Sequence, residues 1–230
     1  MNRRLFSLGL VVCMVLPAFG ADNDRERRRD EEKKGDWWRV YDMVEFPADK
    51  FVDGDSFHLL VPVGRANQDW SIRLYGVDCA ETDVRFPERL AEQAKAMGLA
   101  NKEAVLRWGE KAKARTAELL KGAKQISLHV KSKGKEKTRK SPGQDERYYG
   151  IVELRMPNGE SQMLHTLLLK AGLAIPGAMP APWPPEKEHK DGEEKAIKEF
   201  ERDNERASLD AKKDKHGFWG EKPGPSAVAE

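Results

Sequence analysis

The sequence predicts an α+β protein whose regular structure is mainly β-sheet. Three short β-rich runs lie between 37 and 78 with no helix between them, and a helix-forming region follows over 87–123. The chain of 230 residues has room for one domain of ordinary size with appendages. We expect that domain to span 37–220.

The expected strands are short and rich in aromatic and β-branched residues. WWRVYDMVEF, DSFHLLVPV and DWSIRLYGVD are separated by Pro, Asp, Gly and Asn turn signals, which predicts an antiparallel meander. Two later runs, QISLHV and RYYGIVEL, bring the expected strands to five. Five strands with a helix after the third favour a Greek-key barrel of the OB type, with about three helices packed on it.

Helices are expected in three regions. Ala, Leu, Glu and Lys dominate the first region, and Gly98 and Asn101 divide it into two helices. A short amphipathic helix is expected within 161–174, and a highly charged one over about 193–213. The aromatic pair in KHGFWG, directly after the charged helix, is expected to anchor that helix to the core.

The segment 1–20 has the features of a secretory signal peptide. MNRR is basic, LFSLGLVVCMVLPAF is apolar but short for a membrane span, and small residues surround a cleavage point after Gly20. An uncleaved anchor is one alternative, and a lipoprotein signal at Cys13 is another. Cleavage predicts a secreted or periplasmic protein without stable membrane insertion. Cys79 would then be its only cysteine, which excludes an internal disulfide.

Composition separates further appendages from the domain. Charged residues make up 35% of the chain with a net charge of only +2, which suits a soluble protein and identifies no partner. Within 131–140 there are six Lys or Arg against one Glu, a pattern typical of a solvated loop or of phosphate contact. The other appendages are a charged linker at 21–36, a Pro-rich stretch at 176–192 and a flexible tail at 221–230.

An acidic turn, Asp53-Gly54-Asp55-Ser56, interrupts the second β-rich run. Asp is a poor strand former, and two like charges two residues apart repel each other. The turn is therefore either an ordinary loop or one side of a cation site.

Further acidic and basic residues follow in IRLYGVDCAETD, which contains Arg73, Asp78 and Glu81. If neighbouring strands bring Asp55 and Asp78 together, the two carboxylates could hold a hard divalent cation with room for water. Glu81 could then deprotonate a water near the metal, and the guanidinium of Arg73 could hold a phosphate oxygen. These groups suit the attack of water on a phosphodiester.

Together the two motifs resemble the thermonuclease, or staphylococcal nuclease, family, whose usual patterns are VxDGDT and RLxGxDxPE. Later segments are similar too: WGEKAKARTAELLKGAKQISL to the family's first helix and following strand, MLHTLLLKAGLA to its NxxLVxxGLA helix, and ASLDAKKDKHGFW to its closing motif. The resemblance covers about 40–220, with 83–107 and 131–146 as insertions. It implies a five-stranded OB-type barrel with three helices, acting in calcium-dependent hydrolysis of DNA and RNA.

The resemblance also implies roles for individual residues. Asp55 and Asp78 would be calcium ligands together with the backbone carbonyl of Cys79, and Asp53 would lie near the metal through water. Glu81 matches the general base. Arg73 matches the first phosphate-binding arginine.

The chain departs from the family at two places. The family's second catalytic arginine lies in D-R/K-Y-G-R-x-L; when Arg147 and Tyr148 are aligned with its basic-Tyr pair, Gly150 falls at the arginine. Ala80 replaces the usual Pro before the base, which is expected to loosen that loop. Arg147 still matches a basic residue and is a candidate phosphate contact, and Tyr148 is a candidate for stacking on a base or for sheet packing. Other basic residues that could supply the missing charge are Arg139, Lys140 and Arg155.

Two functions from different classes therefore remain open, and DNA and RNA are the expected partners of a monomeric protein. The first is an exported calcium-dependent nuclease. The second is a weak or inactive nuclease-fold module that binds nucleic acid or a protein ligand, which the loss of the second arginine favours. A purely structural role would leave the four matched residues Asp55, Arg73, Asp78 and Glu81 unexplained.

Overall fold

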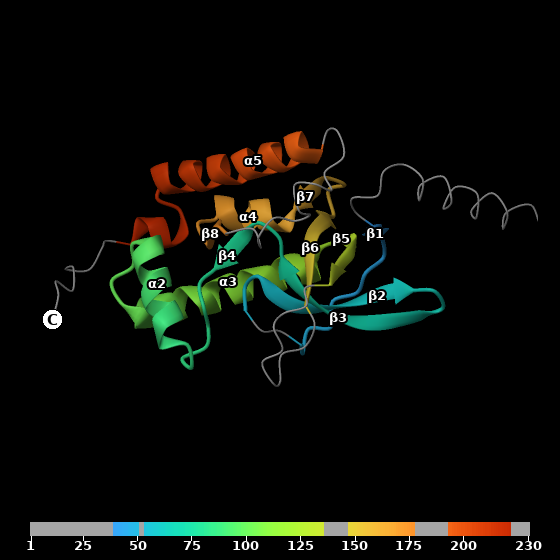
Figure 1. Cartoon of the computed structure of the whole chain (residues 1–230), viewed down its shortest axis with the longest axis horizontal. Coiled ribbons are helices and arrows are strands. Elements are labelled where there is room, and N and C mark those ends of the chain that lie inside the picture. The colour runs from blue at the N-terminus through green and yellow to red at the C-terminus, as the bar shows by residue number, and fades with distance from the viewer. Residues whose placement is uncertain (1–38, 51–52, 136–146, 178–192, 222–230) are drawn as a thin grey trace, which may run out of the picture. The chain divides into compact units, whose positions relative to one another are not determined.

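Eight strands and four α-helices form in the part of the chain that the computed structural model describes, residues 39–50, 53–135, 147–177 and 193–221 (Figure 1). All of these residues belong to the unit Trp37–Glu230. The predicted signal peptide and charged linker lie outside the described residues, as do 136–146, 178–192 and 222–230. The α+β class predicted from the sequence is confirmed.

The main sheet has six strands, five of which the sequence predicts. β3 runs antiparallel to β2 and parallel to β6, and β5 lies antiparallel to β6. The short strand β7 (Ser161–Met163) pairs with the other end of β6. The strand order is β1-β5-β6-β3-β2, with bounds β1 Arg39–Tyr41, β5 Gln125–Lys135, β6 Arg147–Arg155, β3 Ala66–Leu74 and β2 Ser56–Val63.

The predicted meander is correct only for its second and third strands. β2 and β3 form a hairpin, whereas β1 pairs with β5, which is far away in sequence. The chain after β1 nevertheless returns to β2, because Glu45 and Leu60 exchange backbone hydrogen bonds of 3.1 and 2.9 Å. This bridge joins the segment after the edge strand β1 to the other edge strand, β2, so the sheet curls back on itself.

A second, two-stranded sheet was not predicted. The third expected run divides at Gly76, whose φ of +74° ends β3 and begins β4 (Val77–Cys79). β4 pairs antiparallel with β8 (Ala174–Pro176). A Cβ atom on Gly76 would lie 2.5 Å from the ring of Phe200, so this glycine also permits a close contact with the C-terminal helix.

The two helices predicted between the third and fourth expected strands are divided at Gly98 and Asn101, as the sequence predicts. α2 (Pro87–Met97) ends at Gly98, which has a φ of 67°. α3 (Lys102–Gly122) begins after Asn101, whose side chain accepts a 2.9 Å hydrogen bond from the amide of Ala104. α2 lies within the predicted insertion 83–107 and brings the described helices to four, rather than about three.

Two C-terminal helices cover the second sheet. α4 (Leu164–Lys170) and α5 (Glu193–Lys213) lie side by side (Figure 1), and a 3₁₀ turn, η2 (Gly217–Gly220), follows them. The predicted anchor is confirmed, because Phe218 of η2 is buried and stacks edge-on against Trp108 of α3. Within the described residues, no helix is long and apolar enough to cross a membrane.

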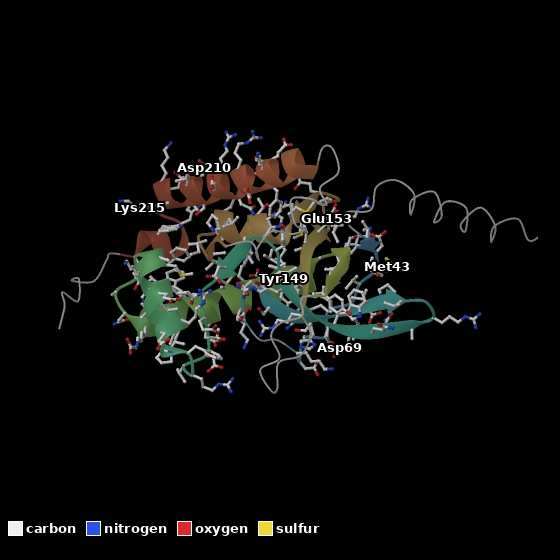
Figure 2. All side chains as sticks on the ribbon, in the orientation of Figure 1. Met43, Asp69, Tyr149, Glu153, Asp210 and Lys215 are labelled. Atoms are coloured by element: carbon white, nitrogen blue, oxygen red, sulfur yellow. The ribbon has the colours of Figure 1, made fainter. Side chains whose placement is uncertain are left out.

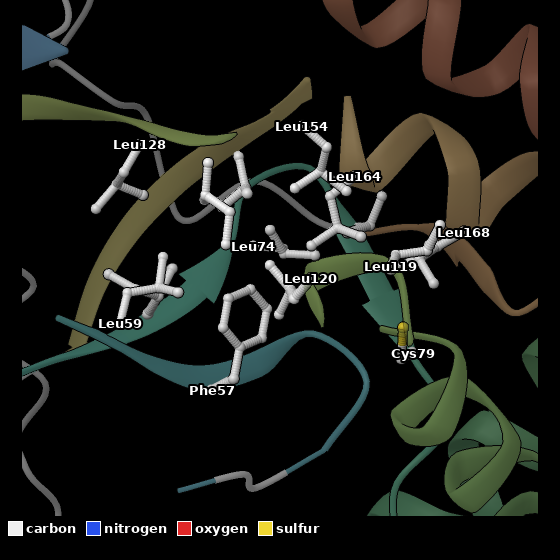
Figure 3. Packing of buried hydrophobic residues seen from close by; sticks show 14 of the residues in the cluster. Phe57, Leu59, Leu74, Cys79, Leu119, Leu120, Leu128, Leu154, Leu164 and Leu168 are labelled. Carbon is white, nitrogen blue, oxygen red and sulfur yellow. The ribbon is translucent and has the colours of Figure 1, made fainter. Parts of the chain in front are cut away.

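Buried apolar side chains form two clusters. The barrel cluster lies between the strands of the main sheet and the helices α3 and α4 (Figure 3). Its members include Phe57, Leu59, Leu74, Cys79, Leu119, Leu120, Leu128, Leu154, Leu164 and Leu168. The helical cluster lies between α2, α3 and η2, and consists of Ala80, Leu90, Ala94, Met97, Leu99, Ala104, Val105 and Phe218. Adjacent residues of one chain segment, Cys79 and Ala80, belong to different clusters.

Candidate active site

Asp55 is the most deeply buried acidic residue of the site, with no exposed surface. One carboxylate oxygen accepts hydrogen bonds from Arg73 Nη1 and from the hydroxyl of Ser56 at 3.0 Å, and the other accepts the backbone amide of Cys79 at 2.6 Å. Burial raises the pKa of Asp55 well above its ordinary value, and the charge of Arg73 opposes that rise. A positive charge close to Asp55 therefore stabilises its ionised form.

The acidic turn packs closely against helix α3. Asp53 accepts the backbone amide of Asp55 at 3.0 Å, a hydrogen bond within the turn. Thr116 of α3 donates a 2.7 Å hydrogen bond to the carbonyl of Gly54, and a Cβ atom on that glycine would lie 2.7 Å from Ala112. The turn needs glycine here because the helix approaches so closely.

Arg73 joins the two predicted metal-binding carboxylates. Its Nη1 donates to Asp55 and its Nη2 donates to Asp78 at 2.8 Å, and 23% of the side chain remains exposed. Burial lowers the pKa of Arg73, but Asp55 and Asp78 outweigh this effect, so its pKa is raised above the ordinary value. The sequence led us to expect Asp55 and Asp78 together on neighbouring strands. One guanidinium does contact both carboxylates, but Asp78 lies on β4, which pairs with β8 and not with β2.

Asp78 has two further partners, which sequence reasoning missed. Arg89 donates to both carboxylate oxygens at 2.6 Å, and the side-chain amide of Gln93 donates to one of them at 3.2 Å. Both partners lie on α2, four residues apart and so on one face of that helix. This spacing was visible in the sequence, but nothing local showed that the face would turn toward Asp78.

The loop that carries Glu81 is held by α2 and α3. Gln93 accepts the Glu81 amide at 2.7 Å, and donates to the carbonyl of Cys79 at 2.8 Å. A Cβ atom on Gly109 of α3 would overlap the carbonyl of Glu81 and would lie 2.8 Å from that of Ala80. Ala80 is itself fully buried, so these contacts hold the loop where the usual proline is absent.

The carboxylate of Glu81 is partly exposed beside the loop. Its Oε1 accepts the backbone amides of Thr82 at 2.9 Å and Asp83 at 3.2 Å. Because an ionised carboxylate can accept further hydrogen bonds, these contacts orient the group and leave acceptor sites for a water molecule.

The register of β6 changes the position assigned to the missing arginine. Gly150 pairs with Leu74, and its Cβ would point at Leu128 of the barrel cluster, 2.8 Å away. An arginine at this position would enter the core, so the alignment that places the second arginine at Gly150 is not compatible with the fold. If Tyr149-Gly150 is aligned with the motif's Tyr-Gly instead, Ile151 falls at the position of the arginine. Isoleucine has no charge with which to bind a phosphate.

The two candidate substrate residues on β6 lie on opposite faces. Tyr148 stacks on Trp70 with ring centres 4.3 Å apart and packs against the barrel cluster, so its position corresponds to the packing role rather than to base stacking. Arg147 pairs with Ser71, and Tyr149 (labelled in Figure 2) pairs with Arg73, so both lie on the face that carries Arg73. Arg155 lies at the opposite end of β6, whereas Arg139 and Lys140 are outside the described residues.

The predicted cation site contains a suitable but small donor set. The oxygens of Asp55 and Asp78 are near enough to be bridged by one guanidinium group, and carboxylate oxygens are the donors that calcium prefers. Cys79 is buried, burial raises the pKa of its thiol, and its predicted ligand carbonyl accepts Gln93. Among the described residues, no three His, Cys, Asp or Glu side chains are grouped so as to hold a metal ion.

One guanidinium group thus joins two buried carboxylates, and a partly exposed glutamate follows on the loop after Asp78. The family described as "Staphylococcal nuclease homologue" matches residues 71–221, and the chain belongs to this family. The match begins after the acidic turn, so the position of Asp55 in the site rests on the contacts described above. No curated protein matches the chain.

Proposed function

We propose that the protein is a calcium-dependent nuclease that hydrolyses phosphodiester bonds of DNA and RNA. The observation that carries the proposal is the bridge from Arg73 to both Asp55 and Asp78, with Glu81 three residues after Asp78. The family supplies the nuclease fold, and this arrangement supplies the groups that phosphodiester hydrolysis needs.

In this proposal Glu81 is the general base and Arg73 binds the phosphate. Glu81 takes a proton from water as the water oxygen bonds to phosphorus, and the P–O ester bond on the opposite side breaks. The departing oxygen is protonated by solvent, and Glu81 returns its proton to solvent. Arg73 turns at least one guanidinium N–H from a carboxylate to a phosphate oxygen, where it stabilises the negative charge of the transition state.

Calcium fits the chemistry of the two carboxylates. Asp55 and Asp78 would hold it, with Asp53 next to them, and the ion would supply positive charge for the phosphate and for a nearby water. Arg73 already offsets part of the repulsion between the carboxylates. Binding of calcium and phosphate together would allow the guanidinium to leave them without uncovering an unpaired buried charge.

We also propose that the protein is exported, because 1–20 has the basic, apolar and small-residue segments of a signal peptide. After cleavage the domain would act outside the cytoplasm as a monomer without membrane insertion. N-terminal sequencing of the exported protein tests the predicted cleavage. A first residue of Ala21 supports cleavage, and an intact Met1 contradicts it.

The first test of activity is digestion of single-stranded DNA by the purified mature protein, with calcium and with a chelator. Glu81→Gln is expected to lower the rate by about 10²–10⁴-fold, as general-base catalysis typically contributes this much. Glu88→Gln is the matched control, because Glu88 is exposed on α2 and the same carboxylate is replaced by an amide.

The outcomes distinguish the two candidate functions. Calcium-dependent cutting that is lost only in Glu81→Gln supports the nuclease. Absence of cutting, together with a salt-sensitive shift of the same DNA, would contradict the nuclease and favour the binding module. Calcium should also raise the melting temperature of the wild type, and Asp55→Asn should remove that rise.

A further inference from the structure

A second guanidinium group reaches the candidate active site from an element that lies within the predicted insertion. Arg89 of α2 contacts both oxygens of Asp78 at 2.6 Å, while Arg73 of β3 contacts the Asp78 oxygen Oδ1 at 2.8 Å. Two arginines from unrelated parts of the chain therefore converge on one carboxylate.

β6 places no guanidinium directly beside Arg73, because Arg147, on the same face, is paired with Ser71 two residues away. The residue paired with Arg73 is Tyr149, and the following residue, Gly150, points into the core. Among the described residues, the cationic partners of Asp78 are Arg73 and Arg89. Arg89 is thus the residue that brings a second positive charge to the centre of the site.

Helix α2 holds Arg89 firmly. Leu90 and Met97, which both follow it on the helix, are buried in the helical cluster. Gln93, one turn after Arg89, contacts Asp78, Cys79 and the amide of Glu81. The same helix therefore positions both the general-base loop and the second guanidinium.

Arg89 is also accessible to a ligand. Its side chain is 42% exposed, compared with 23% for Arg73. Both of its contacts with Asp78 use Nη2, and a guanidinium group has five N–H donors, so donors remain for a second acceptor. Its planar fork can bind two oxygens of one phosphate.

We propose that Arg89 is the second phosphate-binding arginine of this nuclease, supplied by α2 in place of a residue on β6. The inference rests on the proposed function, because it assigns a substrate contact within the same site. When a phosphodiester binds, Arg89 donates to one of its non-bridging oxygens beside Arg73, and the two guanidinium groups share the negative charge that develops.

The test measures binding and hydrolysis separately. Binding of a single-stranded oligonucleotide is measured against salt concentration in calcium, with Glu81→Gln present in every variant to prevent cutting. Loss of one phosphate contact on a single strand lowers the slope of log K against log salt by about 0.7. Arg89→Ala and the longer Arg89→Met are both expected to show this decrease, with melting temperatures close to that of the parent.

Arg115→Ala is the matched control. Arg115 is 43% exposed and pairs with Glu118 on α3, so this variant removes the same charge from a similar surface environment. Its slope is expected to stay within error of the parent. In the otherwise wild-type enzyme, Arg89→Ala should lower kcat/KM by about 10³-fold, and Arg89→Lys should not restore it, because lysine lacks the fork.

The outcomes separate this inference from the proposed function. If the wild type cuts DNA, and the Arg89 variants keep both its rate and its salt slope, the inference is overturned while the nuclease stands. If the wild type does not cut, but the Arg89 variants lower the slope and Arg115→Ala does not, the phosphate contact stands and the nuclease falls. An unchanged slope in both Arg89 variants overturns the inference in every case.

Discussion

The barrel cluster and the helical cluster divide the candidate active site between them. Asp55 and Asp78 belong to segments packed on the barrel cluster, whereas the loop that carries Glu81 begins at Ala80 in the helical cluster. The boundary falls at the peptide bond between Cys79 and Ala80. The segments of Asp55 and Asp78 thus share the core of the sheet, whereas the loop of Glu81, the proposed general base, packs with α2 and α3.

This difference separates the stability of the fold from the arrangement of the site. The barrel cluster is the larger and is enclosed by sheet and helices, so damage to it should affect the whole domain. The helical cluster supports fewer residues, but these include the neighbours of Arg89, Gln93 and Glu81. A substitution in the helical cluster should therefore reduce the rate of hydrolysis by more than its loss of folding stability alone would.

The largest expected loss of stability is in the barrel cluster. Leu59→Ala removes a fully buried side chain and should lower the free energy of unfolding by about 3–5 kcal/mol, measured by urea denaturation. Leu209→Ala makes the same change at an exposed position on α5 and should cost less than about 0.5 kcal/mol. Equal effects at the two positions would contradict the central role of the barrel cluster.

The corresponding change in the helical cluster should be smaller in stability and larger in function. Leu90→Ala should lower the free energy of unfolding by about 2–3 kcal/mol, because α2 packs on one side only. At a temperature where both variants are folded, Leu90→Ala should hydrolyse DNA at least tenfold more slowly than Leu59→Ala. The reason is that Leu90 packs the helix that positions Arg89 and Gln93. If the two folded variants cut DNA equally well, the division of the site is wrong.

A buried histidine tests the barrel side without touching the site. His165 of α4 is 3% exposed beside Phe200, and burial lowers its pKa to about 4. Below its ordinary pKa of about 6.5 the unfolded chain binds a proton that the folded protein does not, so stability falls as the pH drops toward 4. Between pH 7 and pH 5 this should cost about 2 kcal/mol.

The measurement compares urea unfolding of the wild type with that of His165→Leu at both pH values. The difference in free energy between the two proteins should shift by this amount in favour of the variant at pH 5. Parallel pH dependence in the two proteins would show that His165 does not titrate in this way. Hydrolysis should not be affected by the variant at pH 7.

The smallest expected change in stability lies between α3 and the general-base loop. A methyl group at Gly109 would press on the carbonyl oxygens of Ala80 and Glu81, while the gain in helix propensity over glycine is about 1 kcal/mol. Gly109→Ala should therefore change the free energy of unfolding by less than about 2 kcal/mol. It should nevertheless reduce hydrolysis by displacing Glu81.

Gly122→Ala provides the control for this prediction. Gly122 ends the same helix, and a Cβ atom there would meet no other atom within 4 Å. Its rate of hydrolysis should equal that of the wild type. A rate for Gly109→Ala equal to that of the control would show that the contact with the loop is not needed.

Much of the fold could be predicted from local patterns. Gly98 and Asn101 mark helix ends because a left-handed residue and a side-chain acceptor satisfy backbone groups within a few residues. The pairing of β1 with β5 could not be predicted in this way, since it joins residues nearly ninety positions apart, such as Tyr41 and Leu128. Nor did the sequence indicate that Gly76 would divide one expected strand into two.

The sequence by itself determined which groups the site contains: the acidic turn, Arg73, Asp78 and Glu81 occur in two short motifs, and their chemistry follows from their residue types. Only the tertiary structure decided which neighbours they have. Arg89 and Gln93 look like ordinary polar residues of a surface helix until the packing of Leu90 and Met97 turns that helix toward Asp78. The physical reason is that burial of apolar side chains, which has no directional preference of its own, sets the orientation of α2 and with it the position of its charged face.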